Sequence, residues 1–380
     1  MKMAALQLQV CRLQSPGSKS RRSLQSCSRR PHTTRAAQRG RVVVSCAQAD
    51  TDIQSSIRVP SQYLNNTFGL ELSIKDSAEL GRDEVVQQIK DAFTQSGGLV
   101  VIKGANDLLP RQLVQFTSQF GAVEQNPGIK REYLVPGYEE IQVIGNVKDH
   151  QGNPRAIFAD AAVIQDSDIQ YDPSRCEPVW HTDQLFRDPQ PAGSMLYCRE
   201  APPTGGDTCF ADMAAAYEAL PSEEQARLLS LRAVCSYAHH NAKIQKKTPT
   251  YPLLSEEDRR KFPPLYRPIV ACHPFSGRLC LSGFNSSVCA VLEAGETLTQ
   301  EQVDVMEIQG EEDPSVAEQL YAKLLPFATS PQFTIQHSWE EGDLVIWDNR
   351  CTIHAATGFE SQKFPREMWR TTFAPYFEAS

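Results

Sequence analysis

The sequence predicts an α+β fold in which a β core is surrounded by flanking helices and inserted loops. Many short apolar runs, such as residues 99–102 and 193–198, have the length and composition of buried strands. Between them lie segments with apolar residues at helical spacing, of which 83–96 is the clearest. Because many short strands surround inserted helices, the pattern favours a double-stranded β-helix, or jelly roll, as the core. The chain has 380 residues and is 41% hydrophobic, which suffices for a substantial core.

Periodicity and turn signals place the individual elements along the chain. Strands are predicted near 70–74, 99–102, 141–144, 179–186, 193–198, 208–210, 269–273, 279–281, 333–339, 344–347 and 370–374. Helices are predicted over 83–96, from 110 to 120, after the capping residue Asp212, after a capping box at 222–225, and over 299–308 and 314–326. Turns at 274–277 and 340–343 each predict a hairpin between the flanking strands. Two polar, aperiodic segments, 148–174 and 239–264, are predicted as long loops, either lids over a site or solvated surface loops.

Residues 1–49 differ from the rest of the chain. They contain ten Lys or Arg, no Asp or Glu, and many Ser and Gln. This composition is typical of an organelle transit peptide, and it predicts import into the chloroplast stroma with cleavage near Cys46. The alternative is a disordered basic arm that binds nucleic acid. Residues 50–80 are predicted as a linker with a first strand, and 81–380 as a single domain.

The charge and cysteine content of the remaining chain exclude several classes of protein. Beyond residue 49 it carries 28 basic and 46 acidic residues, a formal charge of −18, which would repel nucleic acid. No apolar run exceeds about eight residues, so no membrane span is predicted. Eight cysteines are scattered there without a C-x-x-C pair, which argues against a zinc ribbon or a disulfide framework and for free thiols.

A metal site is predicted around His181 and Asp183. Side chains two apart on a strand point the same way, so the predicted strand 179–186 would present an imidazole and a carboxylate on one face. His354, in a later apolar run, is the best candidate for a third ligand. Two histidines and one carboxylate are the ligand set that holds non-haem Fe(II) with open coordination positions. A lone His-x-Asp pair is weak evidence, but Arg366 lies twelve residues beyond His354, where it can bind a dicarboxylate.

Several motifs make the chain resemble the taurine/2-oxoglutarate dioxygenase (TauD/TfdA-like) family over roughly residues 82–375. They are Trp180-His181-Thr182-Asp183, the segments 203–208, 215–220 and 342–344, and Trp347-Asp348-Asn349-Arg350 leading into His354. The resemblance implies an enzyme that uses Fe(II), O2 and 2-oxoglutarate as cosubstrate. Such an enzyme forms succinate and CO2 while it hydroxylates, or otherwise oxidises, a small organic substrate. The fold of the family agrees with a jelly roll.

The resemblance also implies roles for individual residues. His181, Asp183 and His354 would bind the metal, and Arg366 would bind the far carboxylate of 2-oxoglutarate. Thr208 matches the family threonine whose hydroxyl also reaches the cosubstrate. Arg370 is predicted at the same site, where it would serve 2-oxoglutarate, bind an anionic group of the substrate, or support Arg366 or Asp348. The remaining candidates, His273, His337 and the pair His239 and His240, are predicted to be structural because no partner pattern accompanies them.

The departures from the family pattern bear on the substrate. Glu177 replaces an Asn of taurine-using members, and Asn126-Pro127 stands where they have a substrate-binding His before Pro. The resemblance therefore disfavours taurine. Glu177 and Arg370 together would suit a small zwitterionic or amino-bearing acid, unless both are merely solvated. Asp183 is intact, whereas halogenases of this type have Ala or Gly there, so oxidation is favoured over halogenation.

Two other classes of function are compatible with a jelly roll. A non-catalytic binding or sensor protein would lack a triad member or the downstream arginine, and none is missing here. A cupin-type zinc or manganese enzyme would not need Arg366 at its position. The sequence leaves open the prime substrate, and it is compatible with a homo-oligomer.

Overall fold

The computed structural model describes residues 61–65, 67–126, 129–156, 171–172, 177–247 and 253–374. The predicted transit peptide, its cleavage site, the linker up to residue 60 and most of the predicted loop 148–174 lie outside these ranges, so they stay predictions. Within the described ranges, no helix has the length and apolar character that a membrane crossing requires.

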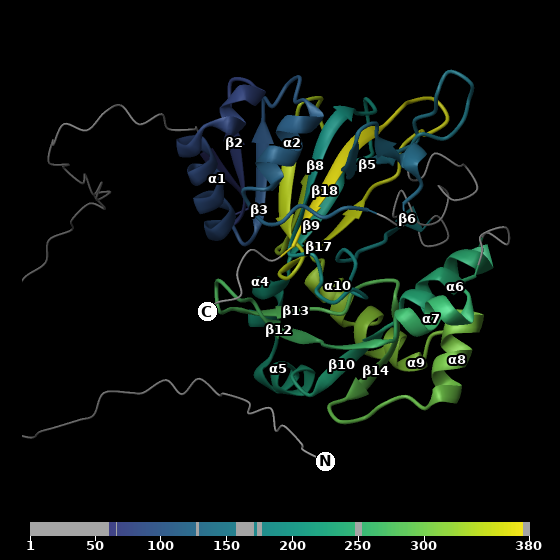
Figure 1. Cartoon of the computed structure of the whole chain (residues 1–380). Coiled ribbons are helices and arrows are strands. Elements are labelled where there is room, and N and C mark those ends of the chain that lie inside the picture. The colour runs from purple at the N-terminus through teal and green to yellow at the C-terminus, as the bar shows by residue number, and fades with distance from the viewer. Residues whose placement is uncertain are drawn as a thin grey trace, which may run out of the picture. The chain divides into compact units, whose positions relative to one another are not determined.

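The largest element is an eight-stranded sheet that runs through the upper part of the molecule in Figure 1. Its strands, in spatial order, are β1 (Ser61–Asn65), β2 (Phe68–Ser73), β3 (Leu99–Lys103), β16 (Leu344–Asp348), β8 (Gly193–Glu200), β18 (Glu367–Phe373), β5 (Tyr138–Gly145) and β4 (Leu134–Val135). Only β2 and β3 pair in parallel, and the other neighbours are antiparallel. Strands from both ends of the described chain therefore meet in one sheet.

A second, three-stranded sheet contributes to the core on one face of the large sheet. It has the order β15 (Thr334–His337), β9 (Thr208–Asp212) and β17 (Thr352–Ala356). Phe210 of β9 is fully buried in a cluster with Val101, Val345 and Trp347 of the large sheet. Alternating residues of the same strands, such as Ile346, belong to a different cluster, as the two-residue period of a strand requires. The two sheets therefore share an apolar layer.

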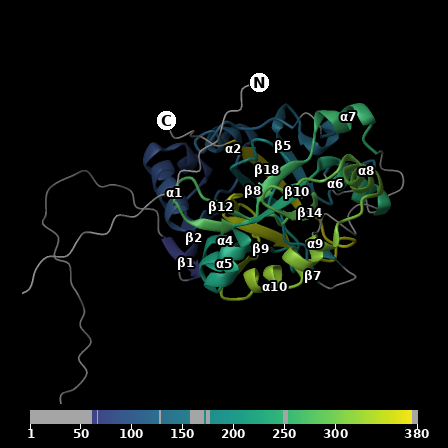
Figure 2. The ribbon, with the colours of Figure 1, turned by 90° about the horizontal axis from the view of Figure 1, so that it is seen from below.

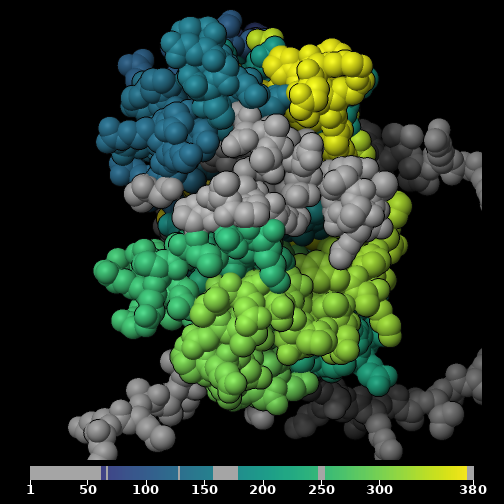
Figure 3. Space-filling view, turned by 90° about the vertical axis from the view of Figure 1, so that its right-hand side faces the viewer, coloured from purple at the N-terminus to yellow at the C-terminus, as the bar shows by residue number. Residues whose placement is uncertain are grey.

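Most of the remaining elements lie in the lower part of Figure 1 and are seen from below in Figure 2. The strands are β10 (Leu231–Cys235), β11 (Leu265–Pro268) and β14 (Val288–Glu293) in one sheet, the pair β12 (Val270–Cys272) and β13 (Leu279–Leu281), and the short pair β6 (Tyr171–Asp172) and β7 (Glu177–Pro178). The helices are α4 (Met213–Glu218), α5 (Ser222–Leu228), α6 (Tyr237–Lys247), α7 (Glu256–Lys261), α8 (Gln300–Gln309), α9 (Pro314–Val316) and α10 (Leu324–Ala328). Helices α6 and α8 lie side by side on the face shown in Figure 3.

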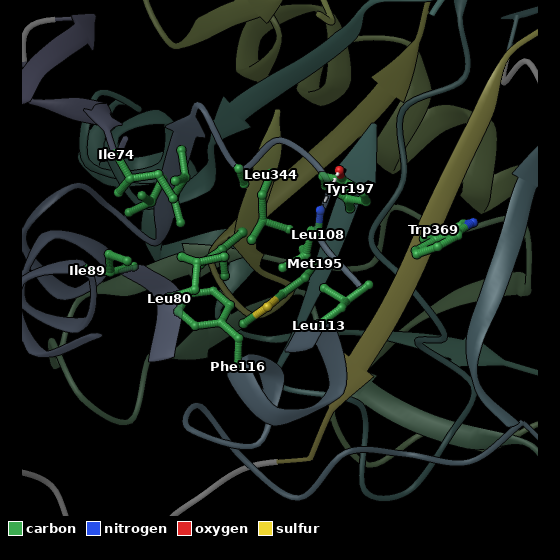
Figure 4. Packing of buried hydrophobic residues seen from close by; sticks show 14 of the residues in the cluster. Ile74, Leu80, Ile89, Leu108, Leu113, Phe116, Met195, Tyr197, Leu344 and Trp369 are labelled. Carbon is green, nitrogen blue, oxygen red and sulfur yellow. Dashed lines mark hydrogen bonds between the residues drawn. The ribbon is translucent and has the colours of Figure 1, made fainter. Parts of the chain in front are cut away.

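Helices cover the other face of the large sheet. Helix α1 (Asp83–Gln95) and helix α2 (Pro110–Thr117) bury apolar side chains at helical spacing, among them Ile89 and Phe116. Figure 4 shows these side chains packed toward residues of the sheet such as Met195. Full burial of a large apolar side chain stabilises the fold by about 1.5–3 kcal/mol, so this layer anchors the sheet on which the site is built.

The predictions for these elements were confirmed in type for β2, β3, α1, α2, β5, β8, β9, α8 and β18, and the hairpin of β12 and β13 forms as expected. The second predicted hairpin is wrong. Strand β15 pairs with β9, whereas β16 pairs with β3 and β8, so the turn at 340–343 passes from one sheet to the other. A short turn shows where two strands are joined, but it does not show that they pair.

Other expectations fail through tertiary packing. The segment 239–264 was expected to be a loop, but its described part contains α6, which packs against α8, and α7, which Ser255 caps. The expected capping box at 222–225 is absent because Pro221 occupies the N-cap position of α5. The expected helix 314–326 is broken into α9, a π-helical turn at Ala317–Tyr321, and α10. Strands β1, β4, β6, β7, β10, β11, β14 and β17 were not predicted.

Candidate metal centre

The two histidines of the predicted triad are joined through their backbones. His181 and His354 form an isolated antiparallel bridge, in which each amide N–H donates to the other residue's carbonyl oxygen at 2.9 and 2.8 Å. Their imidazole rings lie with centroids 4.3 Å apart. His354 belongs to β17, so the bridge places the segment that carries His181 alongside this strand.

The predicted strand over 179–186 is wrong, although its two candidate ligands still meet. Only His181 makes a strand-type bridge, and the chain turns at Asp183, with Gln184 in the left-handed region at φ 47°. The turn nevertheless brings Asp183 Oδ1 to 3.8 Å from His181 Nε2 and 3.9 Å from His354 Nε2. A turn, rather than the alternation of a strand, therefore aims the carboxylate at both imidazoles.

Hydrogen bonds from distant elements hold this turn. The Thr182 N–H donates to the carbonyl of Phe284 at 2.8 Å, and its hydroxyl donates to the carbonyl of Asn349 at 2.6 Å. The side-chain amide of Gln190 donates to the carbonyl of Asp183 at 2.9 Å. Thr182 is buried, so these groups would be costly to leave unpaired, and the turn is fixed from three sides.

The Asp183 carboxylate is ionised in this environment. Burial alone would raise its pKa, but the positive charge of Arg370, the two neighbouring imidazoles and a hydrogen bond from Ser194 lower the pKa to about 2. The Ser194 hydroxyl donates to Oδ2 at 2.7 Å, and Arg370 Nη1 lies 3.4 Å from Oδ1. Oδ1 is therefore the oxygen that faces both imidazoles, while Oδ2 is held by the large sheet.

Both imidazoles are neutral at neutral pH. Burial, the nearby His181 and Arg370 lower the pKa of His354 to about 3, and burial also lowers the pKa of His181. His181 Nδ1 lies 3.3 Å from the carbonyl of Val179, which favours a proton on Nδ1 and leaves the Nε2 lone pair toward Asp183. The three donor atoms lie within 4.8 Å of one another. Two neutral imidazoles and one carboxylate fit the ligand set of a non-haem Fe(II) site.

Buried neutral histidines predict acid sensitivity of the metal-free fold. The pKa of His354 is lowered to about 3 and those of His239 and His240 to about 4, in each case mainly by burial. Unfolded histidines titrate near pH 6.5, so between about pH 6.5 and 4 the unfolded chain binds more protons, and the free energy of unfolding falls as the pH falls. At pH 5.5 each of the three should contribute a loss of about 1 kcal/mol. Thermal unfolding between pH 7.5 and 5.5 tests this, and a Tm that stays constant over this range would contradict it.

Arg366 is a buried cation that has no acidic partner in the described part of the chain. It is 6% exposed and directly precedes β18, its backbone N–H donates to Asn146 Oδ1 at 2.7 Å, and its Nε donates to the carbonyl of Gly206 at 3.1 Å. Gly206 has φ 68°, and a Cβ there would lie 3.3 Å from Arg366 Cδ, so the turn needs glycine to approach the arginine. Burial lowers the pKa of Arg366 to about 10, which leaves it charged at neutral pH. Among the described residues no carboxylate lies within ion-pair distance of its guanidinium.

Thr208, the other predicted cosubstrate residue, begins β9 and is buried. Its hydroxyl oxygen accepts a hydrogen bond from the indole N–H of Trp339 at 3.0 Å. The hydroxyl proton is therefore directed elsewhere and can be donated to a bound anion. Trp339 was not singled out from the sequence, where it looks like one more aromatic residue of a strand.

Arg370 lies on β18, four residues after Arg366, which directly precedes this strand. Residues an even number apart on a strand share a face, so the two arginines lie on the same side of the sheet. Arg370 Nε and Nη2 donate to Gln142 Oε1 at 3.0 and 2.6 Å, and its Nη1 faces Asp183. Among the predicted roles, support of Arg366 or of Asp348 is wrong, because the ion-pair partner of Arg370 is Asp183.

Gln142 and Ser194 were missed, although a polar residue inside an apolar strand was a signal for both.

The two positions that departed from the family pattern are only partly described. Asn126 does not meet the metal-binding residues; its Nδ2 donates to the carbonyls of Glu139 and Glu140 at 3.1 and 3.3 Å. Its Oδ1 accepts from Gln142. Pro127 and the side chain of Glu177 lie outside the described residues, so the predicted pairing of an acid with Arg370 stays a prediction.

A second group of possible ligands, His273, Asp348 and Cys351, is satisfied without a metal. Burial alone would raise the pKa of Asp348, but Arg350 and His273 lower it to about 2. Arg350 Nε and His273 Nε2 lie 2.8 and 3.1 Å from the carboxylate oxygens of Asp348. The structural role predicted for His273 fits this network, which braces the turn between β16 and β17.

The three other histidines that were predicted to be structural also have protein partners. His337 Nε2 lies 3.1 Å from Asp343, and His239 Nδ1 lies 3.0 Å from the carbonyl of Met306. The ring of His240 stacks on Phe186 near the metal-binding turn, with ring centroids 6.1 Å apart. Its Nδ1 lies 2.8 Å from the Ser286 hydroxyl, so the ring is held in place beside the site.

Comparison with known proteins agrees with this geometry. The chain matches the family model of the taurine catabolism dioxygenase TauD, TfdA family over residues 60–372. It is 38% identical over 194 residues to an alpha-ketoglutarate-dependent 2,4-dichlorophenoxyacetate dioxygenase from Burkholderia sp. (strain RASC), which covers 51% of this chain and 57% of that enzyme. The chain therefore spans little more than half the length of this relative. Alpha-ketoglutarate is another name for 2-oxoglutarate.

Two further relatives are matched over more of their length. An (S)-phenoxypropionate/alpha-ketoglutarate-dioxygenase from Sphingobium herbicidovorans is 30% identical over 293 residues, which cover 76% of this chain and 91% of that enzyme. The crystal structure of AAD-2 in complex with Mn(II) and N-oxalylglycine has the same fold, with a TM-score of 0.60 and 23% identity over 85% of this chain and 100% of that one. The resemblance noted from the sequence is thereby confirmed, and the chain belongs to the TauD/TfdA family of alpha-ketoglutarate-dependent dioxygenases.

Proposed function

We propose that this chain uses Fe(II), O2 and 2-oxoglutarate to hydroxylate, or otherwise oxidise, a small organic substrate, with release of succinate and CO2. The observation that carries the proposal is the convergence of His181, Asp183 and His354, whose donor atoms lie within 4.8 Å of one another. Their low pKa values support it, because all three side chains are ready to bind a cation at neutral pH. The two sheets that share an apolar layer support a jelly roll as the scaffold.

The metal would be held by Nε2 of both histidines and Oδ1 of Asp183. When bound, Fe(II) supplies the activation of O2 and the oxidation of the substrate. The protein fixes the ligands beforehand: the backbone bridge sets the spacing of the two histidines, and the Ser194 hydroxyl holds the second carboxylate oxygen. These contacts orient the ligands as outer-shell partners do in other metal sites.

The cosubstrate would lie between the metal ligands and Arg366. A buried guanidinium without an acidic partner among the described residues is suited to a ligand carboxylate, which it can bind through two N–H groups. Thr208 can donate its hydroxyl proton to the same ligand because Trp339 occupies its oxygen. Burial of this region excludes water and strengthens the charge-assisted contacts.

The substrate would carry an anionic group close to the metal. Arg370 contacts the triad directly, because its Nη1 lies 3.4 Å from Asp183 Oδ1. The names of two relatives, which act on 2,4-dichlorophenoxyacetate and (S)-phenoxypropionate, are those of carboxylates and support an organic acid. The substrate would also carry an amino group if the Glu177 carboxylate faces the site, as the sequence predicted.

Anaerobic addition of Fe(II) and 2-oxoglutarate to the metal-free protein tests the proposal. We expect a visible metal-to-ligand charge-transfer band, because the cosubstrate would chelate the metal at its open positions. Succinate formation should then rank taurine, 2,4-dichlorophenoxyacetate and a panel of amino acids, betaines and carboxylates. A protein that binds Fe(II) but gives neither the band nor succinate would contradict the proposed function, and efficient turnover of taurine would contradict the substrate prediction.

A further inference from the structure

Gln142 is a buried polar residue in an otherwise apolar strand. It lies on β5 between Ile141 and Val143, it is 3% exposed, and it stands directly across from Arg370 in the pairing of β5 with β18. Its Oε1 accepts two hydrogen bonds from that arginine. An unpaired buried amide is costly, so the side chain at this position is tied to the guanidinium.

Asn126 determines which way the Gln142 amide points. The Nδ2 group of Asn126 donates to the carbonyls of Glu139 and Glu140, so its Oδ1 is the atom available to Gln142. An oxygen accepts only from the amide nitrogen of Gln142. The amide oxygen of Gln142 must therefore face Arg370, and the orientation of the arginine is fixed through two residues.

Arg370 is thereby held next to the oxygen that the metal would use. Its Nη1 lies 3.4 Å from Asp183 Oδ1, the same oxygen that lies 3.8 and 3.9 Å from the two imidazole nitrogens. A guanidinium that moved fully onto this carboxylate would form a bidentate ion pair. Arg370 and a metal ion thus compete for one oxygen, and the two hydrogen bonds to Gln142 keep the arginine at the edge of the carboxylate.

We propose that Gln142, oriented by Asn126, is a positioning residue that restrains Arg370 and so keeps Asp183 free to bind the metal. The same restraint leaves Arg370 beside the metal, with Nη1 turned toward the site. This inference rests on the proposed metal centre. It assigns a role to two residues that act on the metal centre through Arg370.

Titration of the metal-free protein with Co(II), followed by its visible absorption, tests the role of Gln142. Gln142→Leu removes the acceptor and keeps the size of the side chain, so Arg370 turns to Asp183 and Co(II) binding should weaken by about 10- to 100-fold. Gln142→Glu keeps an acceptor for Arg370 and should bind Co(II) about as tightly as the unmodified protein. The double variant Gln142→Leu with Arg370→Leu lacks the competing cation and should recover the affinity that Gln142→Leu loses.

The control is Gln62→Leu, because Gln62 also makes a cross-strand hydrogen bond, to Glu71 at 3.0 Å, but this hydrogen bond is exposed and joins the edge strand β1 to β2. It should leave Co(II) affinity unchanged. Circular dichroism shows whether each variant is folded, and if Gln142→Leu is not, Asn126→Ala replaces it, with a smaller loss in the same direction. Unchanged affinity in the folded variant, or a double variant as weak as Gln142→Leu, overturns the proposal. A parent protein that binds no Co(II) contradicts the proposed metal centre itself.

Discussion

Replacement of His354 by alanine is expected to abolish succinate formation from 2-oxoglutarate while the fold stays intact. The variant loses one of three donor side chains, but the backbone bridge to His181 does not involve the imidazole and should persist. Loss of an outer-shell partner already costs about 10- to 100-fold in metal affinity or activity, and loss of a direct ligand should cost more. The measurements are succinate formation with added Fe(II), and circular dichroism. His181→Ala and Asp183→Ala should behave in the same way.

The matched control is His239→Ala, which removes an equally buried imidazole from α6. Its ring contacts the carbonyl of Met306 and none of the triad residues, so 2-oxoglutarate turnover should be retained even where the Tm is lowered. Full activity of His354→Ala would show that the metal centre has been assigned to the wrong residues.

Arg366→Ala is expected to raise the KM for 2-oxoglutarate far more than the requirement for iron. The variant leaves a cosubstrate carboxylate without its charge-assisted partner, which typically costs about 2–5 kcal/mol and hence a shift of more than tenfold in affinity. Arg366→Lys keeps the positive charge but loses the planar guanidinium that binds a carboxylate through two N–H groups. Its KM for 2-oxoglutarate should therefore lie between those of the unmodified protein and of Arg366→Ala. The KM for 2-oxoglutarate and the iron requirement are measured separately.

Arg199→Ala is a suitable control for this experiment. Arg199 is also on the large sheet, but its guanidinium packs over the Trp369 ring, 4.8 Å from the centroid. The KM for 2-oxoglutarate should not change in this variant. If Arg370→Ala produced the cosubstrate defect and Arg366→Ala did not, the two arginines would have to exchange roles.

Local signals in the sequence were enough to predict most elements of the fold but not how they pair. The apolar runs of β3, β8 and β16 were recognisable because burial on both faces leaves a continuous hydrophobic pattern. The pairing of β15 with β9 was not recognisable, because β9 lies far away in the sequence. The turn that follows β15 suggested β16 as its partner instead. Helix α6 was missed for a related reason: its mostly polar sequence gains helical stability from packing against α8, which no local pattern reveals.

The candidate site could be predicted as a set of residues but not as a geometry. The motif around His181 and Asp183 and the distal His354 identified three side chains whose donor atoms the structure brings within 4.8 Å of one another. The assumed strand at Asp183 was wrong because the positive φ of Gln184 bends the chain, and nothing in its residue type requires that. Gln142 was overlooked because its importance depends on facing Arg370 across the sheet.

The backbone bridge between His181 and His354 also means that the metal site can be completed only late in synthesis, once His354 has been made. The segment with His181 and Asp183 leaves the ribosome first, and all described strands and helices from β8 to β16 follow before His354 appears. Joining two such distant segments requires closure of a long loop, which is slow compared with local folding. Nascent chains therefore carry only two of the three ligands for much of their synthesis. A complete site marks a chain whose two sheets have already assembled.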